Sequence, residues 1–142
     1  MSTQAVTQTS GYTVTVLGLG AMGLPMATRL ASKVTVHGFD IVDARRKLAA
    51  DAGVIRFDSA RLAATGADAV LLAVRNSEQL NDVLFGANGV AQVLAPGSVV
   101  ILTSTVGAEA IPATVQRLEA YGISLVDAPL SGGRCEPARV IC

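Results

Sequence analysis

The sequence predicts an α/β domain built on a doubly wound parallel sheet of six strands, with helices on both faces. Three observations support this fold class. Short apolar runs rich in β-branched residues alternate with helical stretches along the 142-residue chain. Some runs are apolar almost throughout, as strands covered on both faces are. A glycine-rich turn separates the first run from the first helical stretch. The length corresponds to about one domain.

The first half of the chain supplies three strand–helix units. The run TVTVL predicts the first strand, and the helical spacing of Met22, Met26 and Leu30 predicts the helix after it. Asp43 is a plausible N-cap of the second helix. The predicted strands are residues 13–17, 34–39 and 54–57, and the predicted helices are residues 20–32, 43–52 and 59–65.

The second half repeats this rhythm. The run AVLLAV is apolar throughout, which predicts a central strand. Pro112 is compatible with the last helix only near its first turn, where backbone amides have no helical partner. The predicted strands are residues 69–74, 98–102 and 123–126, and the predicted helices are residues 76–84, 88–94 and 108–121.

Composition limits the function classes. Lys and Arg together number 11, as do Asp and Glu, so no basic excess favours nucleic acid. No apolar run reaches the ~18 residues of a membrane helix. The two cysteines, Cys135 and Cys142, form neither a disulfide framework nor a zinc site, so we expect a cytoplasmic protein without a metal. The hydrophobic fraction of 51% against 15% charged residues suggests apolar surface meant for a partner or a missing second half.

The motif Gly18-Leu19-Gly20-Ala21-Met22-Gly23 follows the first predicted strand directly and opens the first helix. In this G-x-G-x-x-G pattern the first glycine permits a tight turn, the second lets a diphosphate approach the backbone, and the third lets helix and strand pack closely. The helix N-terminus adds free amides and about half a positive charge. The motif in this context predicts a dinucleotide site in a Rossmann sheet.

Asp40 ends the second predicted strand, about 20 residues after the glycine turn, where such sites place an acid. Its carboxylate can accept the hydroxyl groups of an adenosine ribose and would repel a 2′-phosphate. NAD is therefore preferred, with NADP as the alternative because Arg45 and Arg46 lie close enough to accept a 2′-phosphate. Asp40 could instead cap the next helix, although Asp43 is better placed to do so.

Polar residues follow the later strands at their carboxyl ends, where a doubly wound sheet binds its ligand. They are Arg75 and Asn76 after the fourth strand, Thr103, Ser104 and Thr105 after the fifth, and the segment DAPLSGG after the sixth. Each of them could also be a helix cap or a turn residue.

Four segments together resemble the β-hydroxyacid dehydrogenase family. They are VLGLGAMGLPMATRL, GFD at the end of the second strand, TSTVG after the fifth strand and DAPLSGG after the sixth. This family includes 3-hydroxyisobutyrate, tartronate semialdehyde and 6-phosphogluconate dehydrogenases, and residues 83–106 are most similar to its L-threonate dehydrogenase branch.

The resemblance implies roles for individual residues. The glycine turn would hold the diphosphate, with Leu19 and Met22 lining the cofactor, and Asp40 would hold the ribose. Val74, Arg75 and Asn76 would run beside the cofactor, although an arginine departs from the small or apolar residue expected at that position. Thr105 would contact the nicotinamide side. Ser131, Gly132 and Gly133 would bind the substrate carboxylate.

The family's proton-transferring lysine, on a G-x-x-G-x-G-x-x-x-K-x-x-x-N helix of a second, helical half, has no counterpart here. The chain's lysines are Lys33 and Lys47, neither suitably placed, and His37 on a predicted strand is better explained as a packed core residue. We therefore expect no catalytic residue in this chain. Residues 134–142 match nothing in the family pattern, which suggests a truncation or frame change near residue 134, or else a naturally short protein.

The predicted organisation is a loose tail over residues 1–12, a dinucleotide-binding domain over residues 13–133 and an atypical tail over residues 134–142. The predicted function is the NAD(P)-binding domain of an oxidoreductase acting on a small 3-hydroxy acid, inactive alone. The alternative is a non-catalytic NAD(H)-binding or sensing module, for which DAPLSGG would have no task. Homo-oligomers would form through the missing half, and no nucleic acid or membrane partner is expected.

Overall fold

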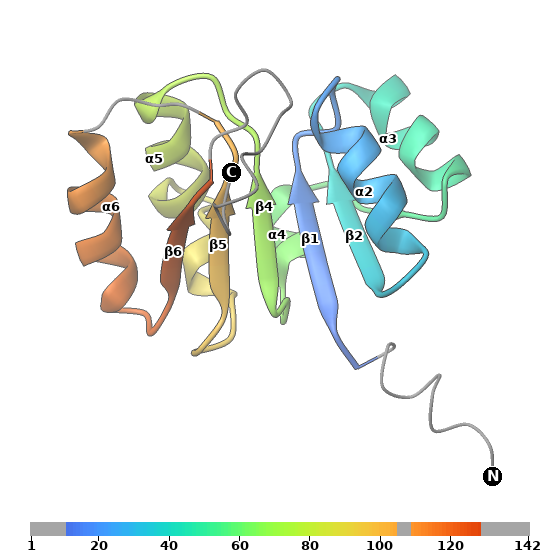
Figure 1. The fold of residues 1–142 in the computed structure, drawn as a ribbon. Helices are drawn as coiled ribbons and strands as arrows, with labels where there is room; N and C mark the ends of the chain where they lie inside the picture. Colours follow the sequence, from blue (N-terminus) through green and yellow to red (C-terminus); the bar gives the residue numbers. More distant parts are fainter. Residues whose placement is uncertain (1–10, 105–108, 129–142) are drawn as a thin grey trace, which may run out of the picture.

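The computed structural model describes residues 11–104 and 109–128. Its six strands form one parallel sheet in the order β3-β2-β1-β4-β5-β6, with helices on both faces, as Figure 1 shows. β2 and β3 lie on one side of β1 in the sheet, and β4, β5 and β6 lie on the other side. The predicted fold class, a doubly wound parallel sheet, is confirmed. Thr105, Ser131, Gly132 and Gly133 lie outside the described residues, as do residues 134–142.

The strands are close to their predicted positions. They are β1 (Thr13–Leu17), β2 (Thr35–Phe39), β3 (Ile55–Arg56), β4 (Ala69–Leu72), β5 (Val99–Leu102) and β6 (Ser124–Asp127). Leu17 pairs in register with Phe39 of β2 on one side and with Leu72 of β4 on the other. The carboxyl ends of these three strands therefore meet at one edge, and the residues that follow them in the chain are brought together.

The helices between the strands are shorter than predicted, except α5, which has the predicted length and is shifted by one residue. They are α2 (Gly23–Ala31), α3 (Asp43–Asp51), α4 (Ala60–Ala64), α5 (Ser77–Phe85), α6 (Ala110–Glu119) and the 3₁₀ helix η1 (Val90–Gln92). The first of them begins three residues later than predicted because the glycine turn precedes it. Pro112 lies in the first turn of α6, as its missing amide requires.

Two apolar layers hold the helices on the sheet, one on each face. Ala27 of α2 and Ala49 of α3 are buried against alternate residues of β1, β2 and β4. The other layer joins α4, α5, η1 and α6 to the opposite face, with Leu72, Leu84 and Leu118 fully buried. Both faces of the central strand β4 are therefore covered, which explains its apolar sequence.

The expectation that Asp43 caps α3 is wrong. Val42 occupies the N-cap position, and its amide donates to the Asp40 carboxylate at 2.8 Å. Asp43 lies one residue inside the helix, where it forms ion pairs with Arg46 at 3.0 Å and Lys47 at 3.3 Å. The hydrogen bond from Lys47 is the main cause that lowers the pKa of the Asp43 carboxyl group. No side chain caps α3, and Asp40 instead holds the amide of Val42 directly before the first turn of the helix.

Replacing Leu72 by alanine tests the packing of β4. Leu72 is fully buried between the sheet and its helices, so Leu72→Ala should lower the free energy of unfolding by about 2–5 kcal/mol. Leu62→Ala is the matched control: it removes the same atoms from a side chain that is 57% exposed and should cost less than about 0.5 kcal/mol. Urea unfolding followed by circular dichroism measures both, and equal losses would contradict the layer assignment.

Candidate functional site

The turn between β1 and α2 is held in shape by its first and last glycines. Gly18 has a φ of 100°, and a Cβ atom there would lie 2.8 Å from the carbonyl oxygen of Ala73. A Cβ atom on Gly23 would collide with the carbonyl oxygen of Gly18. Both positions therefore exclude a side chain because the chain itself approaches so closely.

Gly20, between them, is different. Its φ is not positive, and the nearest atoms to a Cβ built there belong to the flexible side chain of Arg45, at 3.6 Å. No contact within the described part of the chain requires a glycine at this position. The lack of a side chain instead leaves the backbone of the turn open to the space in front of it.

The backbone amides of the turn indicate a site for an anion. The amide of Leu19 donates to Asp40 at 2.7 Å and that of Gly18 to the carbonyl oxygen of Phe39 at 3.0 Å. Within the described ranges, the amides of Gly20, Ala21 and Met22 have no hydrogen-bond acceptor, and α2 has neither a capping side chain nor an acidic first turn. Successive unpaired amides at a helix N-terminus form an anion-binding site.

Asp40 connects the end of β2 to the glycine turn. Its side chain is 6% exposed; one carboxylate oxygen accepts from the amide of Leu19, and the other accepts from Val42. The guanidinium of Arg45 lies 3.5 Å from the first oxygen. Arg46 instead donates to the backbone oxygen of Asp40 and pairs with Asp43, so of the two arginines Arg45 faces the site.

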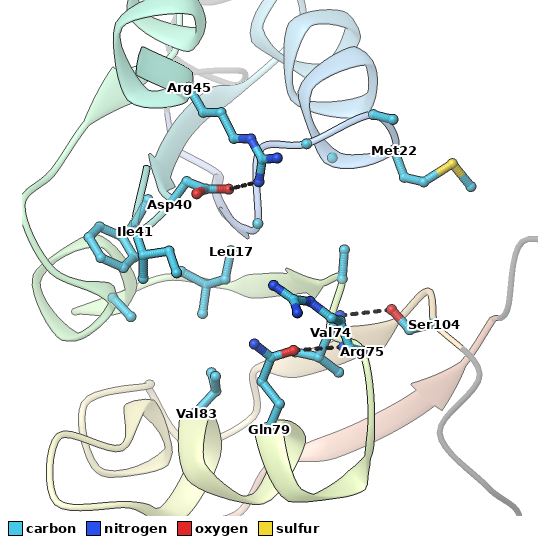
Figure 2. A pocket seen from close by; sticks show the side chains of 17 residues that line it. Leu17, Met22, Asp40, Ile41, Arg45, Val74, Arg75, Gln79, Val83 and Ser104 are labelled. Atoms are coloured by element: carbon cyan, nitrogen blue, oxygen red, sulfur yellow. Dashed lines mark hydrogen bonds and ion pairs between the residues drawn. The ribbon is translucent and has the colours of Figure 1, made fainter. Parts of the chain in front are cut away.

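A cavity of about 370 Å³ lies in front of the turn, between β1, β2, β4 and α5. Figure 2 shows Asp40 and Arg45 on one wall and Arg75, Gln79 and Val83 on the opposite wall. The structure brings eight of the predicted site residues to this cavity: Gly18, Gly20, Ala21, Met22, Gly23, Asp40, Val74 and Arg75. The Met22 side chain is 45% exposed.

Two predicted residues lie beside the cavity rather than on its wall. The side chain of Leu19 is 1% exposed and belongs to the core on the α2 side of the sheet, so only its amide serves the site. Asn76 is the N-cap of α5, where its side chain accepts from the amide of Gln79 at 2.8 Å. Their direct contact with a cofactor stays a prediction, as does that of Thr105, Ser131, Gly132 and Gly133.

Several lining residues were missed by the sequence-based site. They are Leu17, Phe39, Ile41, Ala60, Ala73, Gln79 and Val83, whereas Arg45 and Ser104, which also line the cavity, had been singled out from the sequence. The apolar ones cannot be separated by sequence from ordinary core residues. Ser104 had a signal, its place after the fifth strand, and its hydroxyl group accepts from the amide of Val74 at 2.8 Å. This bond joins the ends of β4 and β5 at the cavity.

The candidate proton carriers do not face the cavity. His37 is half-buried on β2, with Nδ1 3.1 Å from the carbonyl oxygen of Ala63 and its ring 4.7 Å from that of Phe57. Lys33 and Lys47 are exposed and absent from the lining. Over residues 11–104 and 109–128, no cluster of three metal-ligating side chains occurs. No helix in those ranges is both long and apolar enough to span a membrane.

A doubly wound parallel sheet with a G-x-G-x-x-G turn, unpaired amides and an acid after the second strand defines an NAD(P)-binding domain of the Rossmann class. Comparison with known proteins identifies the branch. Residues 13–139 match the NAD-binding domain of 6-phosphogluconate dehydrogenase, and the chain belongs to this family. The suspected resemblance to β-hydroxyacid dehydrogenases is thereby confirmed.

Similar proteins include several dehydrogenases. L-Threonate dehydrogenase from Pectobacterium atrosepticum is 38% identical over 92% of this chain. Two solved structures superpose with a TM-score of 0.78 and 31% identity: 3-hydroxyisobutyrate dehydrogenase from Mycobacterium tuberculosis with L-serine, over 85% of this chain, and that from Salmonella typhimurium, over 86%. The chain spans 44% of the first of these proteins and 41% and 43% of the two structures, so it corresponds to less than half of each.

Alanine substitutions separate the two kinds of glycine. Gly23→Ala should lower the free energy of unfolding by at least ~2 kcal/mol because the methyl group meets backbone. Gly20→Ala should leave stability unchanged or raise it by up to ~1 kcal/mol, yet weaken binding of NADH at least about tenfold. Thermal unfolding and fluorescence titration measure the two effects. A Gly20→Ala chain that binds NADH normally would show that this space serves no ligand.

Proposed function

We propose that this chain is the cofactor-binding half of a dehydrogenase that transfers hydride between NAD and a small 3-hydroxy acid. The observation that carries the proposal is the cavity bordered by Gly20, a glycine that no contact among the described residues requires. Three unpaired amides and the positive end of α2 border this space, a suitable environment for a diphosphate. We assign the cofactor-binding domain to residues 13–133.

Asp40 would bind the hydroxyl groups of the adenosine ribose. An ionised carboxylate offers about four lone-pair directions. The amides of Leu19 and Val42 use two of them, and Arg45 approaches a third. At least one direction remains for a ribose hydroxyl, and because Arg45 is half exposed, its movement would free another. A 2′-phosphate at this place would meet the negative charge, so NAD is preferred over NADP.

Arg45 supports NADP as the alternative cofactor. Its guanidinium borders the cavity beside Asp40 and could turn from the carboxylate to a phosphate. The carboxylate would then lose a partner at the same moment, and its repulsion of the phosphate would grow. This balance favours the unphosphorylated ribose.

The preference for NAD is tested by titration with NADH and NADPH. The chain has no tryptophan, so nicotinamide fluorescence is read directly. The unchanged chain should bind NADH at least about fivefold more tightly than NADPH, because of the charge on Asp40. Asp40→Asn should weaken the binding of NADH about tenfold or more, and it should narrow the difference between the affinities for NADH and NADPH. Asp43→Asn, the same change on the exposed surface of α3, is the control, and tighter NADPH binding by the unchanged chain would overturn the assignment.

The substrate assignment rests on the relatives and on residues outside the described ranges. Ser131, Gly132 and Gly133 would bind the substrate carboxylate, with Thr105 near the nicotinamide. The proton of the substrate hydroxyl group would pass to a lysine on a second, helical half, through which copies would also associate. A cytoplasmic location stays a prediction from the sequence.

The 142-residue chain should therefore bind cofactor without turning over substrate. None of the described residues lining the cavity is a lysine or histidine, and the one carboxylate among them, Asp40, already accepts hydrogen bonds from the amides of Leu19 and Val42 at the proposed ribose end of the site. Incubation with NAD and either L-threonate or 3-hydroxyisobutyrate should form no NADH above the protein-free background. Measurable turnover by the purified chain would contradict the proposal that cofactor binding and proton transfer belong to two different halves of the protein. NADH titration of the same preparation is the control for a folded site.

A further inference from the structure

Arg75 is a cation on the cavity wall opposite Asp40. It follows β4 and lines the cavity together with the glycine turn, and Figure 2 shows its side chain extending into the space between that turn and α5. The resemblance predicts a small or apolar residue at this position, and the arginine departs from that expectation.

The backbone beneath Arg75 is fixed on both sides. Its own amide donates to the side-chain oxygen of Gln79 at 2.6 Å, and the amide of Val74 donates to Ser104 at 2.8 Å. The base of the side chain is therefore ordered by the fold. Holding the guanidinium against a ligand then costs less conformational entropy than it would on a mobile loop.

The positive charge of Arg75 is not balanced by another charge on the cavity wall. The charged lining residues are Asp40, Arg45 and Arg75, and the first two form an ion pair. Within residues 11–104 and 109–128, the guanidinium of Arg75 has no ion-pair or hydrogen-bond partner. Glu78 and Asp82 line a neighbouring surface hollow with it but lie beyond ion-pair distance.

We propose that Arg75 binds the diphosphate of the dinucleotide and thereby supplies the cation that the glycine turn lacks. This inference rests on the proposed function. The turn offers neutral amides only, whereas a guanidinium gives charge-assisted, bidentate hydrogen bonds to phosphate oxygens. Because the adenosine ribose belongs at the Asp40 wall, Arg75 would act equally on NADH and NADPH.

The test compares Arg75→Val, Arg75→Gln and Arg75→Lys. Calorimetry with ADP-ribose, which has the diphosphate but no nicotinamide, is combined with fluorescence titration with NADH and NADPH. We expect the valine and glutamine variants to bind all three ligands more weakly by a similar factor, about ten- to hundredfold. The affinity of the lysine variant should lie between those of the unchanged chain and these variants. Added salt should weaken ligand binding by the unchanged chain more than ligand binding by the valine and glutamine variants. Arg56→Val removes a charge from the exposed strand β3 and is the matched control, with unchanged affinities expected.

Three results would overturn the assignment or its basis. Unchanged affinity for ADP-ribose in both the valine and glutamine variants would show that Arg75 does not contact the diphosphate. Loss of NADH affinity with ADP-ribose unaffected would place Arg75 against the nicotinamide or the substrate instead. If the unchanged chain bound neither NADH nor NADPH, the proposed function itself would fail. Far-ultraviolet circular dichroism verifies that each variant is folded.

Discussion

The close approach of α2 to β1 is the constraint on which the site depends. Gly23 lies against the carbonyl oxygen of Gly18, and Gly18 lies against that of Ala73, so the helix starts directly above the ends of β1 and β4. This geometry directs the unpaired amides of the turn outward instead of into the core. A bulkier residue at either glycine would move the helix away and separate the amides from the remaining walls of the cavity.

The carboxylate of Asp40 stabilises the fold, and in the proposed function the same carboxylate would bind the ligand. Its hydrogen bonds to the amides of Leu19 and Val42 tie together the glycine turn, the end of β2 and the start of α3. The same contacts orient its remaining lone pairs toward the cavity, where Arg45 approaches them. An acid that is 6% exposed but hydrogen-bonded on both oxygens is positioned before any ligand arrives, which lowers the entropic cost of binding.

The cavity is electrostatically asymmetric, and its asymmetry matches a dinucleotide. One wall carries the Asp40–Arg45 pair, close to electrically neutral, and suits a sugar. The other carries Arg75, whose amide donates to Gln79 and whose neighbour Val74 donates to Ser104, and it suits an anion. A site divided in this way suits the binding and orientation of the proposed cofactor.

The sequence alone determined the fold class, the glycine turn and the acid, because strand–helix periodicity and glycine spacing are local properties that need no knowledge of distant contacts. Only the tertiary structure decided that Leu19 is buried, that Asn76 caps α5, and that Arg45 faces the cavity while Arg46 does not. These outcomes depend on which way a side chain turns once three strands meet at one edge. Neighbouring residues on a helix or turn point in different directions, and packing against other elements fixes the choice.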